Sequence, residues 1–266
     1  MKYGHVILVG LQKTLVYRVN FFVRATFGLI PLIATLSLWR AVYAGKSGDP
    51  VGAYSLSQMI SYYLVVTIVD ALTAVADDDW QMAADIRDGA ISQFLLKPVD
   101  YLTFRLSLFV SGRIIYTATA FLPVILFILY QREFFVGPPD GWSCVAFAVS
   151  IVMTALLQFL ISFTMAMLAF WVLEVSTFIF ILFALEYIAG GHLFPLDILP
   201  PMLTKVLAFT PFPYQMFFPV SIYLGRTTGD ALWQGLLIQA FWVATAYVVA
   251  RFVWRRGIRR YSAFGG

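Results

Sequence analysis

The stretch ADDDWQMAADIRDGAISQFLLKPVD, residues 76–100, is the longest polar interruption between two segments that are apolar enough to cross a bilayer. Its apolar residues recur at helical spacing, at positions 86, 90, 91, 94 and 95, which predicts one amphipathic helix over residues 79–97. We expect Asp77, Asp78 and Asp79 to cap its start, where free backbone N–H groups favour negative charge, and Pro98 to end it. Such a helix between two spans lies along the membrane surface or docks on a partner.

The composition indicates an integral membrane protein. Of the 266 residues, 61% are hydrophobic and 12% are charged, whereas soluble domains are about 45–50% apolar and about 25% charged. The single cysteine, Cys144, rules out an intramolecular disulfide and a cysteine-based metal cluster. The formal charge of +4 is a topology signal rather than a sign of nucleic-acid binding. The first residues lack the long apolar run and the cleavage site of a signal peptide.

Six segments are long and apolar enough to span a bilayer, which takes ~20 residues. They are residues 21–44, 54–76, 104–130, 144–173, 175–193 and 231–254, and Glu174 marks the turn between the fourth and the fifth. Residues 3–20 are less apolar and basic on one side, which predicts a helix in the membrane interface; a basic flank to the first span is the alternative. The sequence therefore predicts an all-α membrane protein with a single domain over residues 1–266.

Lysines and arginines indicate the orientation, because an even number of spans places both termini on one side. Of the 18 such residues, 13 fall on the side of the termini and of residues 79–97. These are Lys2, Lys13, Arg18, Arg24, Arg87, Lys97, Arg105, Arg113, Arg251, Arg255, Arg256, Arg259 and Arg260. Since cytoplasmic segments carry the excess of positive residues, both termini and the 79–97 helix are predicted to be cytoplasmic.

The segment 190–229 is apolar but rich in proline, at positions 195, 200, 201, 211, 213 and 219, so no continuous helix can form there. Irregular backbone avoids lipid unless protein or a water-filled cavity covers it. We therefore expect residues 194–224 to form a re-entrant outer hairpin between the fifth and sixth spans. Its short helices would lie near residues 200–209 and 214–223. A plain external loop is the alternative.

Catalytic and nucleotide-binding motifs find little support. Gly45-Lys46-Ser47 ends like a phosphate-binding loop, but Arg40 stands where that motif needs glycine. The same residues resemble the serine motif of rhomboid intramembrane proteases, which needs a histidine at membrane depth. His5 lies in the interface segment, His192 lies at the outer end of the fifth span, and neither has metal-ligand spacing. We predict no catalytic residue and no metal site.

Asp70 and Glu186 lie within predicted spans, where charge is costly, so both are candidates for a translocation path. Glu186 either lines a polar path and contacts a cationic substrate or makes a structural bond to another helix or to the outer hairpin. Asp70 is close enough to the cytoplasmic end to reach the interface or to pair with Arg113. Gln158 and Ser162 are expected to make interhelical contacts.

Several segments, taken in order, resemble a known family. They are Leu38-Trp39-Arg40-Ala41-Val42-Tyr43, the cytoplasmic IRDGAISQFLLKPVD of residues 86–100, Phe194-Pro195-Leu196-Asp197 and Pro211-Phe212. Together they resemble the membrane subunit of a type-2 ATP-binding-cassette (ABC) exporter, in the bacterial family of small six-span permeases. The most specific part is the pattern I-x-x-G-x-I-x-x-x-L-L-x-P-V.

The resemblance implies that the 79–97 helix is a coupling helix, seated on a separate cytoplasmic ATPase dimer that binds ATP and magnesium. The ATPase-coupling positions would be Asp85, Arg87, Asp88, Gly89, Ser92, Gln93, Phe94 and Pro98. This chain would bind no cofactor itself and would pair with a second permease subunit, identical or paralogous, in the bacterial inner membrane. The cargo would be an amphipathic, drug-like or lipid-like substrate.

Other functions stay open on the residues alone. An ion-coupled secondary transporter is disfavoured by the lack of an inverted repeat and by the scarcity of buried charge. An intramembrane enzyme is disfavoured by the positions of the histidines. A structural membrane-assembly protein is the third alternative.

Overall fold

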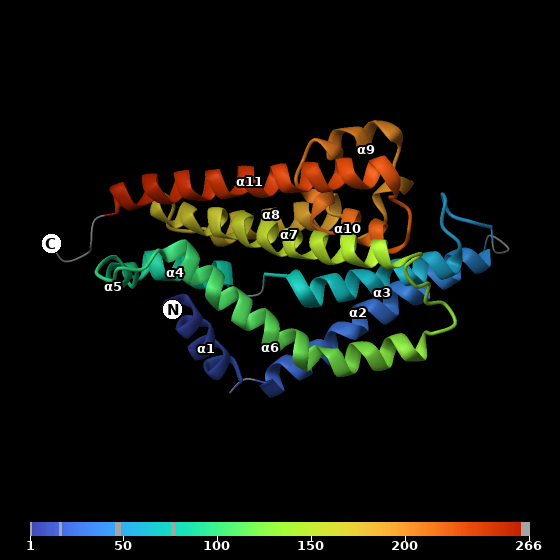
Figure 1. Ribbon diagram of the computed structural model, residues 1–266, viewed down its shortest axis with the longest axis horizontal. Coiled ribbons are helices and arrows are strands. Elements are labelled where there is room, and N and C mark those ends of the chain that lie inside the picture. Colours follow the sequence, from blue (N-terminus) through green and yellow to red (C-terminus); the bar gives the residue numbers. More distant parts are fainter. Residues whose placement is uncertain (1, 16–17, 46–48, 76–77, 262–266) are drawn as a thin grey trace.

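The computed structural model describes residues 2–15, 18–45, 49–75 and 78–261, in which all regular elements are helices. Figure 1 shows the long helices running along the long axis of the molecule. The start of α1 (Lys2–Leu15) and the end of α11 (Gly229–Arg260) lie at one end, together with α4 (Asp78–Arg87) and α5 (Ile91–Leu95). We call this the α5 end. The proline-rich helix α9 (Pro201–Ala208) lies toward the other, the α9 end.

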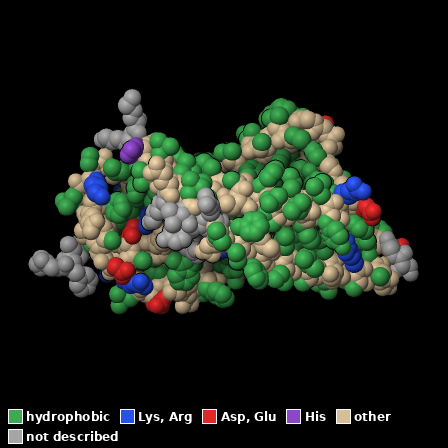
Figure 2. Space-filling view, turned by 90° about the horizontal axis from the view of Figure 1, so that it is seen from below, with side chains coloured by type: hydrophobic (Ala, Val, Ile, Leu, Met, Phe, Trp, Pro, Cys, Tyr) green, Lys and Arg blue, Asp and Glu red, His purple; other side chains and the backbone are tan. Residues whose placement is uncertain are grey.

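Five of the described helices are long and apolar enough to cross a membrane. The candidate spans are Val19–Gly45 in α2 (Arg18–Gly45), Leu56–Thr73 (α3), Tyr101–Tyr130 (α6), Gly141–Phe170 (α7, Gly141–Ala166, continued by η1, Met167–Phe170) and Gly229–Arg260 (α11). Figure 2 shows apolar side chains across the middle of one face, with charged side chains gathered toward its two ends. A helix suits this setting because it satisfies its backbone hydrogen bonds internally, without water.

The predicted fifth span, residues 175–193, is longer than the helix that forms there. α8 (Ser176–Ala189) has 14 residues, fewer than the ~20 that a span takes. It ends because Gly191 adopts a φ of 97°, a left-handed conformation open to glycine. The freed backbone is then held by α3, where the Tyr62 hydroxyl donates to the Gly191 carbonyl at 2.5 Å and Tyr63 donates to the carbonyl of Leu193 at 2.7 Å.

The polar stretch forms two helices, so the prediction of a single helix over residues 79–97 is wrong. α4 ends at Arg87, Gly89 takes a φ of 78°, and α5 begins at Ile91. A left-handed residue cannot continue a right-handed helix, and glycine adopts it without a steric penalty. Helical structure ends at Leu95, before Pro98. The predicted caps Asp77, Asp78 and Asp79 fall on residues whose side chains, or whose whole placement, lie outside the described part of the chain.

The N-terminal helix is shorter than the predicted interfacial helix over residues 3–20, because α1 ends at Leu15 and α2 begins at Arg18. α1 packs along α6 at Gly10, where an added Cβ would lie 2.8 Å from the Ser111 Oγ. That hydroxyl also donates to the Ile7 carbonyl at 3.1 Å. The apolar side chain of Leu8 is 58% exposed. An apolar side turned away from the protein suits a helix lying in the membrane interface.

The proline-rich segment forms short helices close to the two that were predicted. In chain order the segment contains η2 (Leu196–Ile198), α9, η3 (Phe212–Tyr214) and α10 (Phe217–Tyr223). α9 has no buried residue, whereas α10 is buried against α7 and α3. The chain thus folds back on the spans through α10 and leaves α9 as its outermost part.

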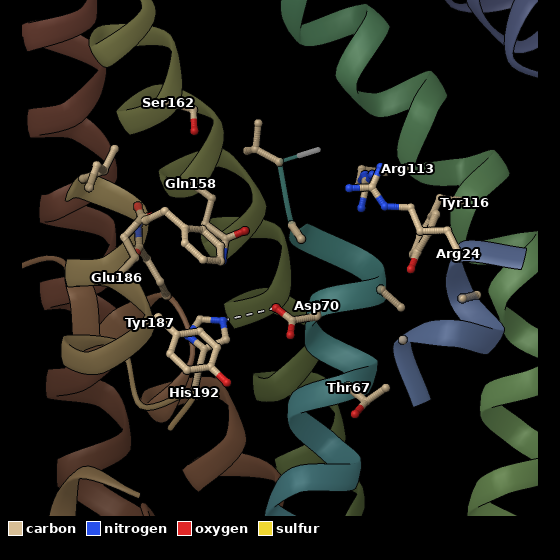
Figure 3. A pocket seen from close by; sticks show the side chains of 18 of the residues that line it. Arg24, Thr67, Asp70, Arg113, Tyr116, Gln158, Ser162, Glu186, Tyr187 and His192 are labelled. Carbon is tan, nitrogen blue, oxygen red and sulfur yellow. Dashed lines mark hydrogen bonds and ion pairs between the residues drawn. The ribbon is translucent and has the colours of Figure 1, made fainter. Parts of the chain in front are cut away.

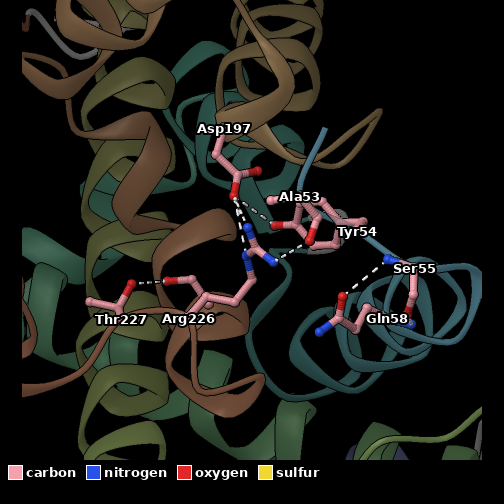
Figure 4. A network of polar contacts seen from close by, with 8 residues as sticks. Ala53, Tyr54, Ser55, Gln58, Asp197, Arg226 and Thr227 are labelled. Carbon is pink, nitrogen blue, oxygen red and sulfur yellow. Dashed lines mark hydrogen bonds and ion pairs between the residues drawn. The ribbon is translucent and has the colours of Figure 1, made fainter. Parts of the chain in front are cut away.

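A polar network ties this segment to the start of α3 (Figure 4). The Asp197 carboxylate accepts hydrogen bonds from the Tyr54 hydroxyl at 3.1 Å and from the Arg226 guanidinium at 2.9 Å. Arg226 also donates to the Ala53 carbonyl at 3.0 Å and lies 3.9 Å above the Tyr54 ring. Burial and the neighbouring Asp197 raise the pKa of Tyr54, so its hydroxyl keeps its proton and remains a donor.

Close packing of α11 on α10 depends on Gly235, where an added Cβ would lie 2.1 Å from the Phe218 Cε2. We predict that Gly235→Ala lowers the thermal unfolding temperature in detergent, with a cost of about 1–3 kcal/mol, because α11 or Phe218 must move. The matched control is Gly112→Ala in α6, where an added Cβ meets nothing within 4 Å. The control should be neutral or slightly stabilising. An equal fall in both variants would contradict this packing.

Candidate functional site

Four of the eight predicted ATPase-coupling residues are exposed at the tip of the α5 end. They are Arg87, Asp88, Gln93 and Pro98, which we call the docking face. The Arg87 Nε lies 3.1 Å from the Asp88 Oδ1, and both side chains are more than half exposed, at 54% and 61%. Leu96 lies beside them with 88% of its surface exposed. Leu96 was not among the predicted coupling residues, although an exposed leucine pair followed by lysine and proline is an available signal.

The other four predicted coupling residues turn toward the protein. The Asp85 carboxylate accepts a hydrogen bond from the Tyr101 hydroxyl at 2.8 Å and pairs with the Arg105 guanidinium, whose side chain is only 6% exposed. Arg105 Nε in turn donates to the Tyr101 oxygen at 3.0 Å. Asp85 therefore ties α4 to α6 and is not part of the docking face.

Gly89, Ser92 and Phe94 attach α5 in the same manner. The Ser92 hydroxyl donates to the Gly89 carbonyl at 2.9 Å and lies 2.8 Å from the hydroxyl of Tyr261, just beyond α11. The Phe94 ring packs edge-on to Tyr101, with 5.3 Å between ring centroids. The amphipathic pattern predicted a buried stripe and an exposed one, but the tie to Tyr261 joins parts of the chain that are far apart in sequence.

Asp100 fixes the junction of α1, α6 and α11. It caps α6 by accepting from the Thr103 backbone N–H at 3.0 Å, it pairs with Arg251 of α11, and its own N–H donates to the Tyr3 hydroxyl of α1 at 3.2 Å. Burial acts to raise the pKa of the Asp100 carboxyl, but the hydrogen bonds from Thr103 and Arg251 outweigh burial and hold this pKa below its usual value. The group is therefore a carboxylate at neutral pH.

A cavity of about 520 Å³ lies among α2, α3, α6, α7 and α8 and extends from Trp80 of α4 to His192 beyond α8. Figure 3 shows polar side chains reaching into it from both sides. Both predicted path residues, Asp70 and Glu186, line it. The aromatic side chains Phe180 and Phe183 of α8 also line it, so the cavity combines charge with apolar surface.

The acidic wall of the cavity is built from three segments. The Asp70 Oδ1 of α3 lies 3.2 Å from the His192 Nε2, and the Glu186 Oε1 of α8 accepts a hydrogen bond at 2.9 Å from the Gln215 side chain, which is 1% exposed. Glu186 thus fits both interpretations of the sequence, as a cavity residue and as a structural bond to the proline-rich segment. For Asp70 the contact is His192, which the sequence did not suggest.

The opposite wall is basic. Arg24 of α2 and Arg113 of α6 reach in across from Glu186 and His192 (Figure 3), and the Arg113 guanidinium lies 4.8 Å from the centroid of the Tyr116 ring. Gln158 of α7 lines the cavity between the walls with 8% of its surface exposed, and its Oε1 accepts no hydrogen bond from the described residues. A buried acceptor of this kind is costly unless water or a ligand reaches it. The cavity is therefore suited to a polar or charged occupant.

Among the described residues, no group of three or more His, Cys, Asp and Glu side chains has a geometry that could hold a metal ion. Lys46 and Ser47, from the two motifs that resembled a phosphate-binding loop and a protease serine, lie outside the described residues.

Comparison with known families identifies a match over most of the chain. The family described as "ABC-2 family transporter protein" matches residues 29–265, from within α2 through α11. The match includes the docking face and nearly all of the cavity lining. No curated protein gives a significant match to the chain.

Water access to the cavity can be tested with cysteine labelling. In a Cys144→Ser background, we predict that Ser162→Cys, at a position lining the cavity, reacts with a small charged thiol reagent. The control is Val152→Cys on the same helix, where the native side chain is 61% exposed on the outer surface of the molecule. A thiol facing lipid should stay unreactive because the thiolate does not form in hydrocarbon. Equal labelling of the two positions would contradict the prediction that water reaches Ser162 through the cavity.

Proposed function

Because the chain belongs to the ABC-2 family of transporter proteins, we propose that it is the permease subunit of an exporter driven by a separate cytoplasmic ATPase. The main support is the two-sided character of α4 and α5. One side carries the exposed docking face, and the other is bonded to α6 and to Tyr261. A partner that binds the tip would thereby act on two of the long helices.

The proposed mechanism is rigid-body coupling. Closure of an ATPase dimer displaces the docking face, and the Asp85–Arg105 pair transmits the movement from α4 to α6. Packed helices shift as units rather than deform continuously, so a push at one end changes how the spans surround the cavity. ATP and magnesium would be bound by the ATPase, and the permease would supply the path.

The proposed substrate is amphipathic, either drug-like or lipid-like, and moves outward through the cavity. Asp70 and Glu186 would contact a positive group, Arg24 and Arg113 a negative one, and the phenylalanines of α8 an apolar body. Because one wall of the cavity is acidic and the other is basic, the walls do not by themselves favour a cationic cargo over an anionic one. They favour a cargo with polar and apolar parts over a purely apolar one.

A second permease subunit, identical or paralogous, is part of the proposal. Phe180 and Phe183 line the cavity and are still 69% and 61% exposed, so one side of the cavity is open and a second subunit would close it. With both termini and the docking face in the cytoplasm, the assembly would lie in a bacterial inner membrane. This orientation is supported by the excess of Lys and Arg on that side.

The alternative function, an ion-coupled secondary transporter, is favoured by one specific observation. Asp70, His192 and Glu186 bring three titratable groups to a single cavity, which is the kind of site where protons are exchanged. Transport by the purified chain in liposomes, driven by a pH gradient without any ATPase, would support this alternative. Transport only with the ATPase and ATP would support the exporter.

We predict that Asp88→Lys weakens co-purification of the partner ATPase about tenfold, equivalent to ~1.4 kcal/mol. The Asp88 carboxylate is exposed on the docking face, so replacing it with lysine reverses a charge that is presented to the partner. The control is Asp49→Lys, which changes an exposed carboxylate at the other end of the molecule. Binding that is unchanged in Asp88→Lys, or equally reduced in both variants, argues against the docking face.

We predict a different result for Asp85→Asn, because this carboxylate pairs with a buried guanidinium. The variant should bind the ATPase but lose most ATP-driven transport, and its free energy of unfolding should fall by about 3 kcal/mol because the charge of Arg105 is left unpaired. The double variant Asp85→Leu/Arg105→Met removes both charges and should recover thermal stability without recovering transport. Full transport in the double variant would mean that the pair has no coupling role.

A further inference from the structure

A second, open groove of about 890 Å³ lies at the α5 end, away from the cavity described above. One side is made by Leu168 of η1 and by Trp171 just beyond it, and the other by the last turns of α11. The residues of α11 that line it are Phe252, Val253, Arg256, Arg259 and Arg260. None of the groove residues lines the cavity.

The groove is graded from apolar to basic along α11. Phe252, Arg256 and Arg259 are spaced i, i+4 and i+7, so they follow one face of the helix. At a rise of 1.5 Å per residue they cover ~10 Å along the axis. The Arg256 guanidinium lies 5.2 Å from the centroid of the Phe252 ring, at the change from apolar to charged surface. The guanidinium groups thus gather at the C-terminal end of α11, beside the apolar part of the groove.

Close packing brings the two sides of the groove together. Gly257 lets α11 approach η1 so closely that an added Cβ would lie 2.2 Å from the Phe170 Cδ2. Phe170 packs edge-on to Trp171, with 6.0 Å between the ring centroids. Trp171 is consequently held beside the arginines while it remains 38% exposed. Tryptophan at this position is typical of the level of lipid headgroups.

We propose that this groove binds one anionic phospholipid. Its headgroup phosphate pairs with Arg256 and Arg259, while an acyl chain lies along Leu168, Phe252 and Val253. Guanidinium groups bind phosphate oxygens through paired, charge-assisted hydrogen bonds. Basic pockets between membrane helices near the surface recognise anionic headgroups. The arginines alone would accept any phosphate, but the apolar floor favours a ligand that carries a hydrocarbon chain.

The position of the groove relative to the bilayer agrees with a bound phospholipid. α11 has 32 residues, whereas ~20 cross the hydrocarbon, so its last turns reach the headgroup layer. This holds for either orientation of the chain in the membrane, and the lipid site does not depend on an ATPase. The groove also lies close to the attachment of α5. Phe170, which packs on Trp171 of the groove, lies 6.1 Å from Tyr261 between ring centroids, and Tyr261 contacts Ser92 of α5. A bound lipid therefore braces the segment to which α5 is attached.

The experiment is native mass spectrometry of the purified full-length chain in detergent, titrated with phosphatidylglycerol or with phosphatidylcholine. The wild-type chain should retain one phosphatidylglycerol in preference to phosphatidylcholine. Arg256→Gln/Arg259→Gln should weaken this adduct about tenfold. Arg132→Gln/Arg255→Gln removes the same charge from exposed arginines outside the groove and should leave the adduct unchanged. Unchanged thermal unfolding of both double variants establishes that they fold.

Two further arms identify the source of the phosphate. Inorganic phosphate at the same concentration should not displace phosphatidylglycerol, and Leu168→Ser should weaken the lipid adduct because it makes the apolar floor polar. Displacement by inorganic phosphate would reduce the groove to an anion site and overturn the proposal. Equal adducts with both lipids, or equal loss in both double variants, would overturn it as well. Loss of chain dimers in Arg256→Gln/Arg259→Gln with the lipid adduct intact would assign the groove to a second copy instead.

Discussion

A guanidinium that is only 6% exposed has to be paired, and this requirement fixes the α5 end of the molecule. Arg105 projects from α6, and Asp85 is the carboxylate that meets it, so α4 can occupy only a position that keeps the two in contact. The Tyr101 hydroxyl bridges the pair, and its ring stacks on Trp254 of α11 at 4.9 Å. The buried charge of Arg105 therefore determines how α4, α6 and α11 are arranged.

The α9 end has a comparable clamp. Asp197, Arg226 and Tyr54 join the proline-rich segment to the start of α3, with charged groups that are partly exposed. Between these two ends the long helices offer mostly apolar side chains to their surroundings (Figure 2). The arrangement follows from the solvent: hydrocarbon gives polar groups no hydrogen bonds, so specific polar ties concentrate where the helices leave it. The cavity departs from this pattern, because it carries charge on both walls.

The sequence predicted the long helices well because apolar length records burial in hydrocarbon directly. α2, α3, α6 and α7 with its continuation η1 begin and end within three residues of predicted spans, whereas α11 runs six residues past the end of the predicted sixth span. It predicted backbone breaks poorly: the left-handed turn at Gly89 splits the expected helix, and Gly191 shortens the expected fifth span. Periodicity describes which side chains share a face, but it does not record φ.

The candidate site shows the same limit for side chains. The pattern placed Asp85 and Asp88 together on a polar face, and only the position of Arg105 separates an inward role from an outward one. Asp70 and Glu186 were identified from their cost in a span. Their surroundings were not, because His192 is 122 positions from Asp70 and Gln215 is 29 from Glu186. Contacts between distant segments depend on how the helices pack, which hydropathy does not encode.

The turn at Gly89 gives the two short helices different attachments, and this shapes the proposed mechanism. α4 is bonded through Asp85 to α6, while α5 is bonded through Ser92 to Tyr261 at the end of α11. A single straight helix would pass a push at its tip to both spans as one displacement. With a left-handed residue between them, the two halves can divide the same push between α6, which carries Arg113 on the basic wall, and α11, which packs on α7 and its Gln158. Walls that move by different amounts change the shape of the cavity, and a change in shape is what alternating access requires.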